Sequence, residues 1–175
     1  ADLLLGDLLF TKADSEFTQI GREVMLKKAL SAFNTVYDYC IVDTAPNLGI
    51  LLANALAAAD SVIIPLTASR FSLKGMNQLT KFIDEIRQDR NPELKINGVL
   101  LTRYNKRTVL NRMLLDETQQ SAEILGTKLY KTTIRQSIAM EESQVMQEDI
   151  YAHSSTIAED YNNFVDEFLE GEYEH

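Results

Sequence analysis

The stretch YDYCIVDTAPNLG, residues 37–49, runs a short apolar segment directly into an acid and then breaks. Residues 39–42 carry the aromatic and β-branched side chains typical of a buried strand. Asp43 follows at once, and a proline, an asparagine and a glycine come after it. A carboxylate at the end of a parallel strand lies where such sheets bind ligands, but aspartate is also a good first residue for the helix that follows. These residues alone leave both interpretations open.

Strands and helices alternate along the chain. Apolar periodicity predicts strands at residues 39–42, 61–66, 95–102 and 128–134. It predicts helices at residues 21–33, 48–59, 75–89, 108–125 and 137–147, and a last helix that opens near Thr156. No hairpin signal separates consecutive strands. The pattern therefore predicts an α/β protein with a mostly parallel sheet, helices on both faces and a single domain over residues 1–175.

The composition indicates a folded protein. The chain has 175 residues, of which 45% are hydrophobic, and this is enough for a sizeable core. No apolar run reaches the roughly 18 residues of a membrane span, and the N-terminal segment lacks the basic start of a signal peptide. The single cysteine, Cys40, lies within the expected strand at 39–42 and excludes a disulfide inside the chain. We expect a cytoplasmic protein.

The net charge of −9 is unevenly distributed along the chain. Residues 140–175 hold eleven acids and no lysine or arginine, so the rest of the chain is slightly basic. Residues 95–115 carry no acid and five bases, which are Lys95, Arg103, Lys106, Arg107 and Arg112. Such a patch is either an ordinary solvated face or a surface for phosphate groups.

Three separated segments carry motifs in the order and spacing of one family. They are YDYCIVDTAPNLGILLANALAAADSVIIPLTASRFSLKGMNQL from residue 37, INGVLLTRYNKRTVLNRMLLDE from residue 96 and YKTTIRQSIAMEESQ from residue 130. Together they resemble the ParA-type partition ATPases, the deviant-Walker branch of the P-loop NTPases. In that family a strand-end aspartate followed by Thr-Pro-Pro forms the Walker B motif. Asp43, Thr44 and Pro46 match it, whereas Ala45 replaces the first proline.

The resemblance implies a nucleotide site with ATP and Mg²⁺ as cofactors and ATP hydrolysis as the activity. Asp43, with Thr44 beside it, would hold a water bound to Mg²⁺. The loop after the third expected strand lies near the adenine in the family, which implies Thr102 and Asn105. Glu142 matches a family glutamate near the nucleotide, although a solvated helix face explains it equally well.

One motif of the family is absent from these 175 residues. Nothing in the sequence matches G-x-x-x-x-G-K-[ST], the loop that cradles the phosphates. We therefore expect the chain to be the C-terminal portion of a longer ATPase, part of a three-layer sandwich whose N-terminal strands are missing. Because the triphosphate then has no cradle of backbone N–H groups and lysines, we expect the chain alone to be inactive as an ATPase.

The basic patch gains a role from the same resemblance. ParA-type proteins bind DNA without sequence preference once ATP has dimerised them. Arg107, with Lys106 and Arg103, holds the matching position, and Arg112 and Arg135 are weaker candidates. Arg135 could equally face the nucleotide base or a neighbouring acid. The implied partners are non-specific DNA on the nucleoid, a centromere-binding ParB-type protein and a second copy of the chain.

Two other functions stay open. A MinD-like membrane-cycling ATPase would end in a basic amphipathic helix that lies on anionic lipid. The last expected helix is amphipathic but acidic, so we expect anionic membranes to repel it and the protein not to bind them. A non-enzymatic interaction module is the other alternative.

Overall fold

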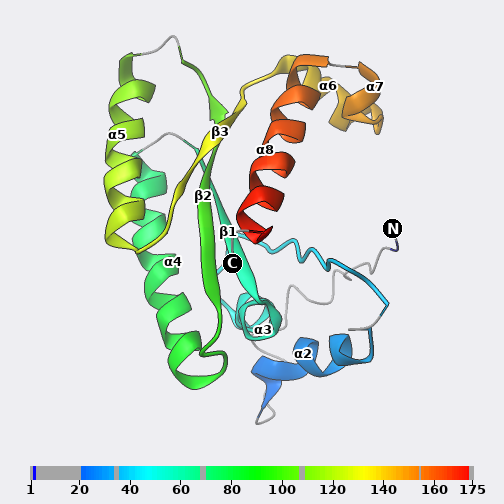
Figure 1. Ribbon diagram of the computed structural model, residues 1–175, viewed down its shortest axis with the longest axis vertical. Coiled ribbons are helices and arrows are strands. Elements are labelled where there is room, and N and C mark those ends of the chain that lie inside the picture. The colour runs from blue at the N-terminus through cyan, green and yellow to red at the C-terminus, as the bar shows by residue number, and fades with distance from the viewer. Residues whose placement is uncertain are drawn as a thin grey trace. The chain divides into compact units, whose positions relative to one another are not determined.

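The computed structural model describes residues 2, 21–33, 36–67, 70–106, 109–153 and 155–173. Figure 1 shows the helices and strands. In chain order they are η2 (Arg22–Val24), α2 (Met25–Leu30), η3 (Ser31–Phe33), α3 (Ile50–Ala58), β1 (Ser61–Thr67), α4 (Arg70–Asp89), β2 (Lys95–Tyr104), α5 (Val109–Ile124), β3 (Leu129–Arg135), α6 (Ile138–Met146), α7 (Ile150–His153) and α8 (Ser155–Tyr173). The described sheet has the strand order β1-β2-β3, and β2 pairs with β3 in parallel. The predicted α/β fold class is confirmed.

The chain divides into two compact units. Unit 1 comprises Ala1–Val62 and Leu79–Lys95, and unit 2 comprises Ile63–Gln78 and Ile96–His175. None of the described helices combines the length and the apolar character needed to cross a bilayer.

Unit 1 is built around α3, which is apolar on nearly every side. Its buried side chains are Ile50, Leu52, Ala53, Ala55, Leu56 and Ala57. Asn54 ties this helix to the segment before it, because its side-chain amide donates to the Arg22 carbonyl at 2.7 Å and accepts the Leu26 N–H at 3.1 Å. The helix predicted at residues 48–59 is confirmed over residues 50–58.

The end of α4 also supports α3. The helix ends at Asp89, the predicted last residue, and the residue before Pro92 resists the helical conformation. The Asn91 side-chain amide then donates to the carbonyls of Leu56 and Ala59 at 2.9 and 2.7 Å. Asn91 is 8% exposed, so these two bonds satisfy a buried amide and close the carboxyl end of α3.

The predicted strand at residues 39–42 is wrong. These residues have no regular secondary structure and are not part of the described sheet. Ile41 is 94% exposed, and Cys40 is an exposed thiol rather than a buried strand residue. A strand depends on hydrogen bonds to a neighbour and on packing across strands. An apolar run therefore does not form a strand where no described segment pairs with it.

In unit 2, α8 and α5 lie on opposite faces of β3 (Figure 1). The core lies beneath α8, where Tyr130 meets Phe164 edge-on with ring centroids 5.0 Å apart. The other members of this core are Leu100, Ile134 and Ile157, with Ile63, Ile150, Tyr161 and Phe168 packed against them. Ile157, Tyr161, Phe164 and Phe168 therefore form the inner face of α8, whereas Val165 is 46% exposed.

A glycine in β2 makes room for the largest side chain of this core. A Cβ atom on Gly98 would lie only 2.5 Å from Cε2 of Tyr130. The Tyr130 ring is fully buried, its hydroxyl donates to the side-chain oxygen of Asn97, and the Lys128 ammonium lies 4.8 Å from the ring centroid. The close approach of β2 to this ring therefore requires glycine.

β3 is an outer strand of the described sheet, and α8 supplies hydrogen-bond acceptors for its edge. The Glu167 carboxylate accepts the backbone N–H groups of Lys131 and Thr132, each at 2.8 Å. Two turns earlier, the Asp160 carboxylate accepts the backbone N–H of Arg135 at 3.0 Å. These carboxylates occupy the donors that an added strand would use, so α8 protects the edge of the sheet.

Candidate functional site

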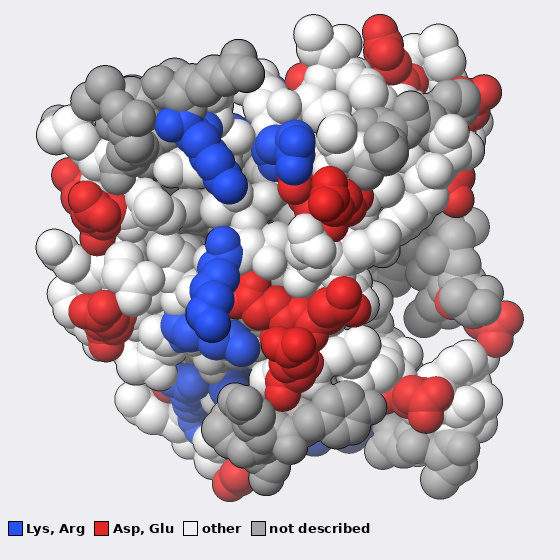
Figure 2. All heavy atoms as spheres, turned by 45° about the horizontal axis from the view of Figure 1, so that its top comes forward, with Lys and Arg blue, Asp and Glu red and all other residues white. Residues whose placement is uncertain are grey.

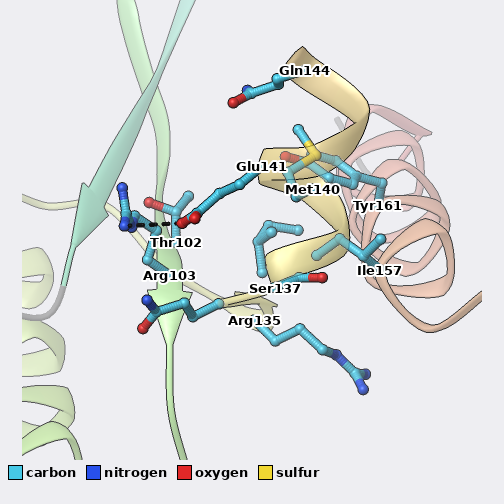
Figure 3. Close-up of a pocket in the computed structure, with 11 residues that line it drawn as sticks. Thr102, Arg103, Arg135, Ser137, Met140, Glu141, Gln144, Ile157 and Tyr161 are labelled. Atoms are coloured by element: carbon cyan, nitrogen blue, oxygen red, sulfur yellow. Dashed lines mark hydrogen bonds and ion pairs between the residues drawn. The ribbon is translucent and has the colours of Figure 1, made fainter. Parts of the chain in front are cut away.

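A pocket of about 180 Å³ opens at the carboxyl ends of β2 and β3, where parallel sheets bind ligands (Figure 3). Its apolar floor includes Ile134, Ile157 and Met140. Polar side chains at the rim are Thr102, Arg103, Gln136, Ser137, Glu141 and Gln144. All of these residues belong to unit 2.

The size and the lining of the pocket restrict what it can hold. Pockets that take a whole drug-sized ligand have volumes of about 300–1,000 Å³, so this one fits a ring or another part of a larger ligand. Ile134 and Ile157 are buried, whereas the rim offers amide, hydroxyl and charged groups. Burial raises the pKa of Tyr161, whose phenol is uncharged at neutral pH in any case and can donate a hydrogen bond. The pocket therefore offers an apolar floor with hydrogen-bonding groups around its edge.

A β-bulge shapes the end of β2 beside the pocket. Leu101 is opposite Thr133 and Tyr104 is opposite Arg135, so three steps along β2 match two along β3. Arg103 lies in this bulge with a φ of 52°, a left-handed conformation that costs a non-glycine residue about 1–3 kcal/mol. Strained residues of this kind concentrate at ligand sites, which supports the pocket as a functional site.

The Arg103 side chain pairs with Glu141 on α6. Its Nη2 atom lies 3.5 Å from Oε1 of Glu141, and Figure 3 shows the contact between the end of β2 and the helix. The two side chains are 64% and 59% exposed. Exposed ion pairs contribute about 0.2–1 kcal/mol, so this contact adds little to the stability of the fold.

Arg135 makes a much firmer pair with Asp160 on α8. Its Nε and Nη2 atoms donate to the two carboxylate oxygens at 2.7 and 2.6 Å, and its backbone N–H adds a third bond. Burial acts to raise the pKa of Asp160, but the hydrogen bonds from Arg135 and the charges of Arg135 and Lys106 outweigh it and hold this pKa below its usual value. Of the three partners that the sequence left open for Arg135, the structure shows the neighbouring acid.

The structure brings several predicted site residues together. Thr102, Arg103 and Arg135 line the pocket, and the Thr102 hydroxyl donates to the Leu66 carbonyl at 3.5 Å. Lys106 is exposed and close enough to Asp160 to affect its pKa, and Asn105 is exposed beside it. The carboxyl ends of β2 and β3 therefore carry a cluster of the predicted residues.

Sequence reasoning missed Glu141, which lines the pocket, and singled out Glu142, which does not. Glu142 is exposed on the same helix, one residue and about 100° further round. Helical spacing could have indicated the face that meets the pocket, because Ser137, Glu141 and Gln144 are related by steps of four and three residues and all three line the pocket.

Other predicted residues belong to unit 1 or lie outside the described residues. Asp43 and Thr44 are exposed on the irregular segment of unit 1, and their roles stay predictions. Arg107 lies outside the described residues, and of Arg112 only the backbone, in α5, is described. Among the described residues, no three histidine, cysteine or acidic side chains are grouped as metal ligands, and Asp43 was expected to bind Mg²⁺ only through water.

Figure 2 turns the view of Figure 1 so that its upper end comes forward. On this surface, basic and acidic side chains lie side by side. Arg103 and Arg135 each have an acidic partner in the structure, Glu141 and Asp160 respectively. The basic residues predicted from the sequence thus do not form a purely cationic surface. Acids from α6 and α8, in the acidic C-terminal segment, neutralise part of their charge.

The fold and the pocket place the chain among α/β proteins with a candidate ligand site at the carboxyl edge of a parallel sheet. A family model described as an AAA domain matches residues 1–96. The chromosome partitioning protein ParA of Myxococcus xanthus is 45% identical over 101 residues, which cover 58% of this chain and 36% of that protein. The crystal structure of a plasmid partition protein from Borrelia burgdorferi matches with a TM-score of 0.65 and 27% identity, covering 93% of this chain and 59% of that chain.

A third relative holds a nucleotide. Cobyrinic acid a,c-diamide synthase from Mycobacterium smegmatis, with a bound ATP analogue and magnesium, matches with a TM-score of 0.60 and 35% identity. The match covers 63% of this chain and 45% of that chain. The chain therefore belongs to the AAA-domain family, in its ParA-type branch of P-loop ATPases, and the resemblance found in the motifs is confirmed. It spans about half the length of the curated relatives that it matches.

Proposed function

We propose that the chain supplies the base-binding and DNA-binding part of a nucleotide-dependent partition ATPase. The observation that carries this proposal is the pocket at the carboxyl ends of β2 and β3, in a chain of the ParA-type family. The ATP analogue and magnesium held by one relative support ATP and Mg²⁺ as the ligands of the whole site. In this proposal residues 1–175 act as one domain.

The nucleotide base would lie in the pocket, with Ile134, Ile157 and Met140 beneath it. Thr102 and Ser137 offer hydroxyl groups at its edge, and Asn105 follows at the end of β2. We assign Glu141 to this site and keep Glu142 as a weaker candidate, because Glu141 lines the pocket. Asp43, with Thr44, would hold the water bound to Mg²⁺.

These 175 residues provide few groups that could bind the phosphates of the nucleotide. The sequence contains no G-x-x-x-x-G-K-[ST] loop, so the chain alone should bind MgATP weakly and should not hydrolyse it at a useful rate. Calorimetry with MgATP tests this directly. Binding in the micromolar range would contradict the proposal.

DNA phosphates would be bound at the exposed end of β2 and in the turn after it. We assign this role to Arg103 and Lys106, which the structure describes, and to Arg107 and Arg112, which continue the basic run in the sequence. Arg135 is the weakest candidate, because Asp160 already binds its guanidinium. The ParA-type relatives suggest that nucleoid DNA, a ParB-type protein and a second copy of the chain are the partners of the whole protein.

Binding to a random-sequence DNA duplex at several salt concentrations tests the DNA proposal. Each phosphate contact adds about 0.9 to the slope of log K against log salt, so Lys106→Gln should lower affinity at low salt and reduce that slope by about 0.9. Lys131→Gln, an exposed charge in β3, is the matched control and should change neither quantity by as much. Equal effects of the two substitutions would contradict the assignment.

A further inference from the structure

The Arg103–Glu141 pair differs in kind from the other ion pair at the pocket. It has one contact of 3.5 Å between two side chains that are more than half exposed. Arg135 and Asp160 share two contacts of 2.6 and 2.7 Å, and the Asp160 side chain is only 9% exposed. An exposed single contact exchanges readily with water or with another anion. The Arg103–Glu141 pair can therefore open while the rest of the site keeps its fold.

Glu141 belongs to the pocket as well as to this pair. It lines the pocket from α6, and its side chain reaches across toward the end of β2 (Figure 3). A ligand that fills the pocket displaces this side chain or engages it. A ligand that takes up the carboxylate draws it away from Arg103.

Arg103 keeps its place at the rim when Glu141 moves. Its backbone is fixed by the bulge and by the left-handed φ of 52°, which turn the side chain out of the regular alternation of β2. Lys106 follows three residues later and is also exposed. When the Glu141 carboxylate has moved away, Arg103 and Lys106 remain as exposed cations at the rim. The phosphates of a nucleic acid can then bind there.

We propose that Glu141 competes with nucleic-acid phosphates for Arg103, so that a ligand in the pocket strengthens polyanion binding at the rim. This inference rests on the proposed function, because it links the two ligands proposed for the same end of the sheet. Arg103 is then the residue that connects them. The acid that lines the pocket and the acid that weakens DNA binding are then the same side chain.

A double-mutant cycle on the 175-residue chain tests the competition. Affinity for a random-sequence DNA duplex and for heparin is measured at low salt for the unsubstituted protein, Glu141→Gln, Arg103→Gln and the double variant. Glu148→Gln removes the same charge from an exposed acid just beyond α6 and is the control. Freeing Arg103 should give Glu141→Gln a gain of about 1.4- to fivefold beyond that control, the range that follows from exposed ion-pair energies. The gain should vanish when Arg103 is replaced.

Adenosine tests the link to the pocket. At a concentration that saturates the NMR shifts of pocket residues such as Ser137 and Met140, it should strengthen heparin binding by the unsubstituted chain and leave Glu141→Gln unchanged. An equal effect of adenosine on both proteins, including none, overturns the link. A lack of any adenosine-dependent shift at the pocket contradicts the proposed base site instead, and the double-mutant cycle then decides the role of Glu141 alone.

The outcomes of the cycle distinguish the competition for Arg103 from the proposed DNA-binding function. If Glu141→Gln binds both polyanions no better than Glu148→Gln, or if its gain survives without Arg103, the competition is refuted. If heparin shows the expected coupling and DNA is bound by none of the proteins, the proposed DNA-binding function fails and the competition for Arg103 is supported.

Discussion

Glu167→Gln removes the carboxylate that holds α8 to the outer edge of β3. In the native protein the two carboxylate oxygens accept the backbone N–H groups of Lys131 and Thr132, each at 2.8 Å. Glutamine keeps one carbonyl oxygen, so one N–H loses its acceptor and the other loses its bond to a charged group. The side-chain NH₂ group cannot substitute, because it donates hydrogen bonds and does not accept them.

The loss can be estimated from these two bonds. A hydrogen bond to a charged group contributes about 1.5–3 kcal/mol, and one between neutral groups contributes about 0.5–1.5 kcal/mol. The Lys131 N–H is exposed and can turn to water, which reduces the difference. We therefore expect the free energy of unfolding of unit 2 to fall by about 2 kcal/mol. With a urea m value near 2 kcal/mol/M, the unfolding midpoint should fall by about 1 M.

Urea unfolding followed by circular dichroism measures this loss, and amide hydrogen exchange locates it. Exchange should accelerate first at Lys131 and Thr132, the residues whose N–H groups Glu167 accepts. Glu170→Gln removes an exposed charge one turn further along α8 and should leave the midpoint within about 0.2 M of the original, the scale of an ordinary surface substitution. Equal midpoints for the two variants, with unchanged exchange at Thr132, would refute the edge-capping argument.

Acid should remove the advantage that Glu167 gives. Burial acts to raise the pKa of Glu167, but the backbone hydrogen bonds from Lys131 and Thr132 outweigh it, so the folded-state pKa lies below the ordinary 4.5. A carboxylate with a lowered pKa stabilises the fold fully above its unfolded-state pKa and loses this effect as the pH falls through the folded-state pKa. The stability gap between the original chain and Glu167→Gln should therefore be largest at neutral pH and shrink below about pH 4.5.

Three further substitutions test other contacts of the fold. Asn91→Ala removes the side chain that closes the carboxyl end of α3. In urea titrations it should lower the free energy of unfolding of unit 1 by about 1–3 kcal/mol. An unchanged midpoint would show that water replaces the two bonds. Gly98→Ala places a Cβ atom against the Tyr130 ring. It should lower the free energy of unfolding by about 1–3 kcal/mol and shift the Tyr130 ring signals in NMR spectra. Unchanged stability would mean that the ring moves aside without loss. Asp160→Asn weakens the pair with Arg135. It should lower the free energy of unfolding by about 2 kcal/mol at pH 7, and by less in acid, because the pKa of Asp160 is lowered in the folded protein. A loss that did not depend on pH would show that the charge of Asp160 does not stabilise the fold.

The elements that could be predicted from the sequence are those with a local signal. The apolar character of residues 50–58 predicts a buried helix, and the Asn91–Pro92 pair predicts the end of α4, because both effects act within a few residues. The strands β1, β2 and β3 lie within two residues of their predicted bounds. Their parallel arrangement followed from the helices between them.

The errors arise where distant contacts decide the structure. Residues 39–42 have the composition of a strand, but a strand needs a neighbour, which local composition does not supply. The bonds from Asp160 and Glu167 to β3 join residues 25–36 positions apart, so no sequence pattern reveals them. The partner of Arg135 was left open for the same reason.

The candidate site was predicted in part. The residues at the end of β2 were found because a family motif and a basic run coincide there. Glu141 was missed in favour of Glu142, since the choice between adjacent residues depends on which face of α6 meets the pocket. The left-handed φ of Arg103 gave no signal at all, because a non-glycine residue in that conformation reflects the bulge and not the side chain.

A titration of the 175-residue chain with adenosine, followed by NMR, shows whether the pocket of unit 2 binds a nucleotide base. Adenosine lacks phosphates, so it reports only on the proposed base pocket at the ends of β2 and β3. We expect saturable shifts at Thr102, Ser137 and Met140, which line or adjoin the proposed base site. Lys27 and Lys28 of α2 belong to unit 1, serve as controls and should show none. Saturable shifts confined to unit 1, or no shifts at millimolar adenosine, would contradict the proposed base site.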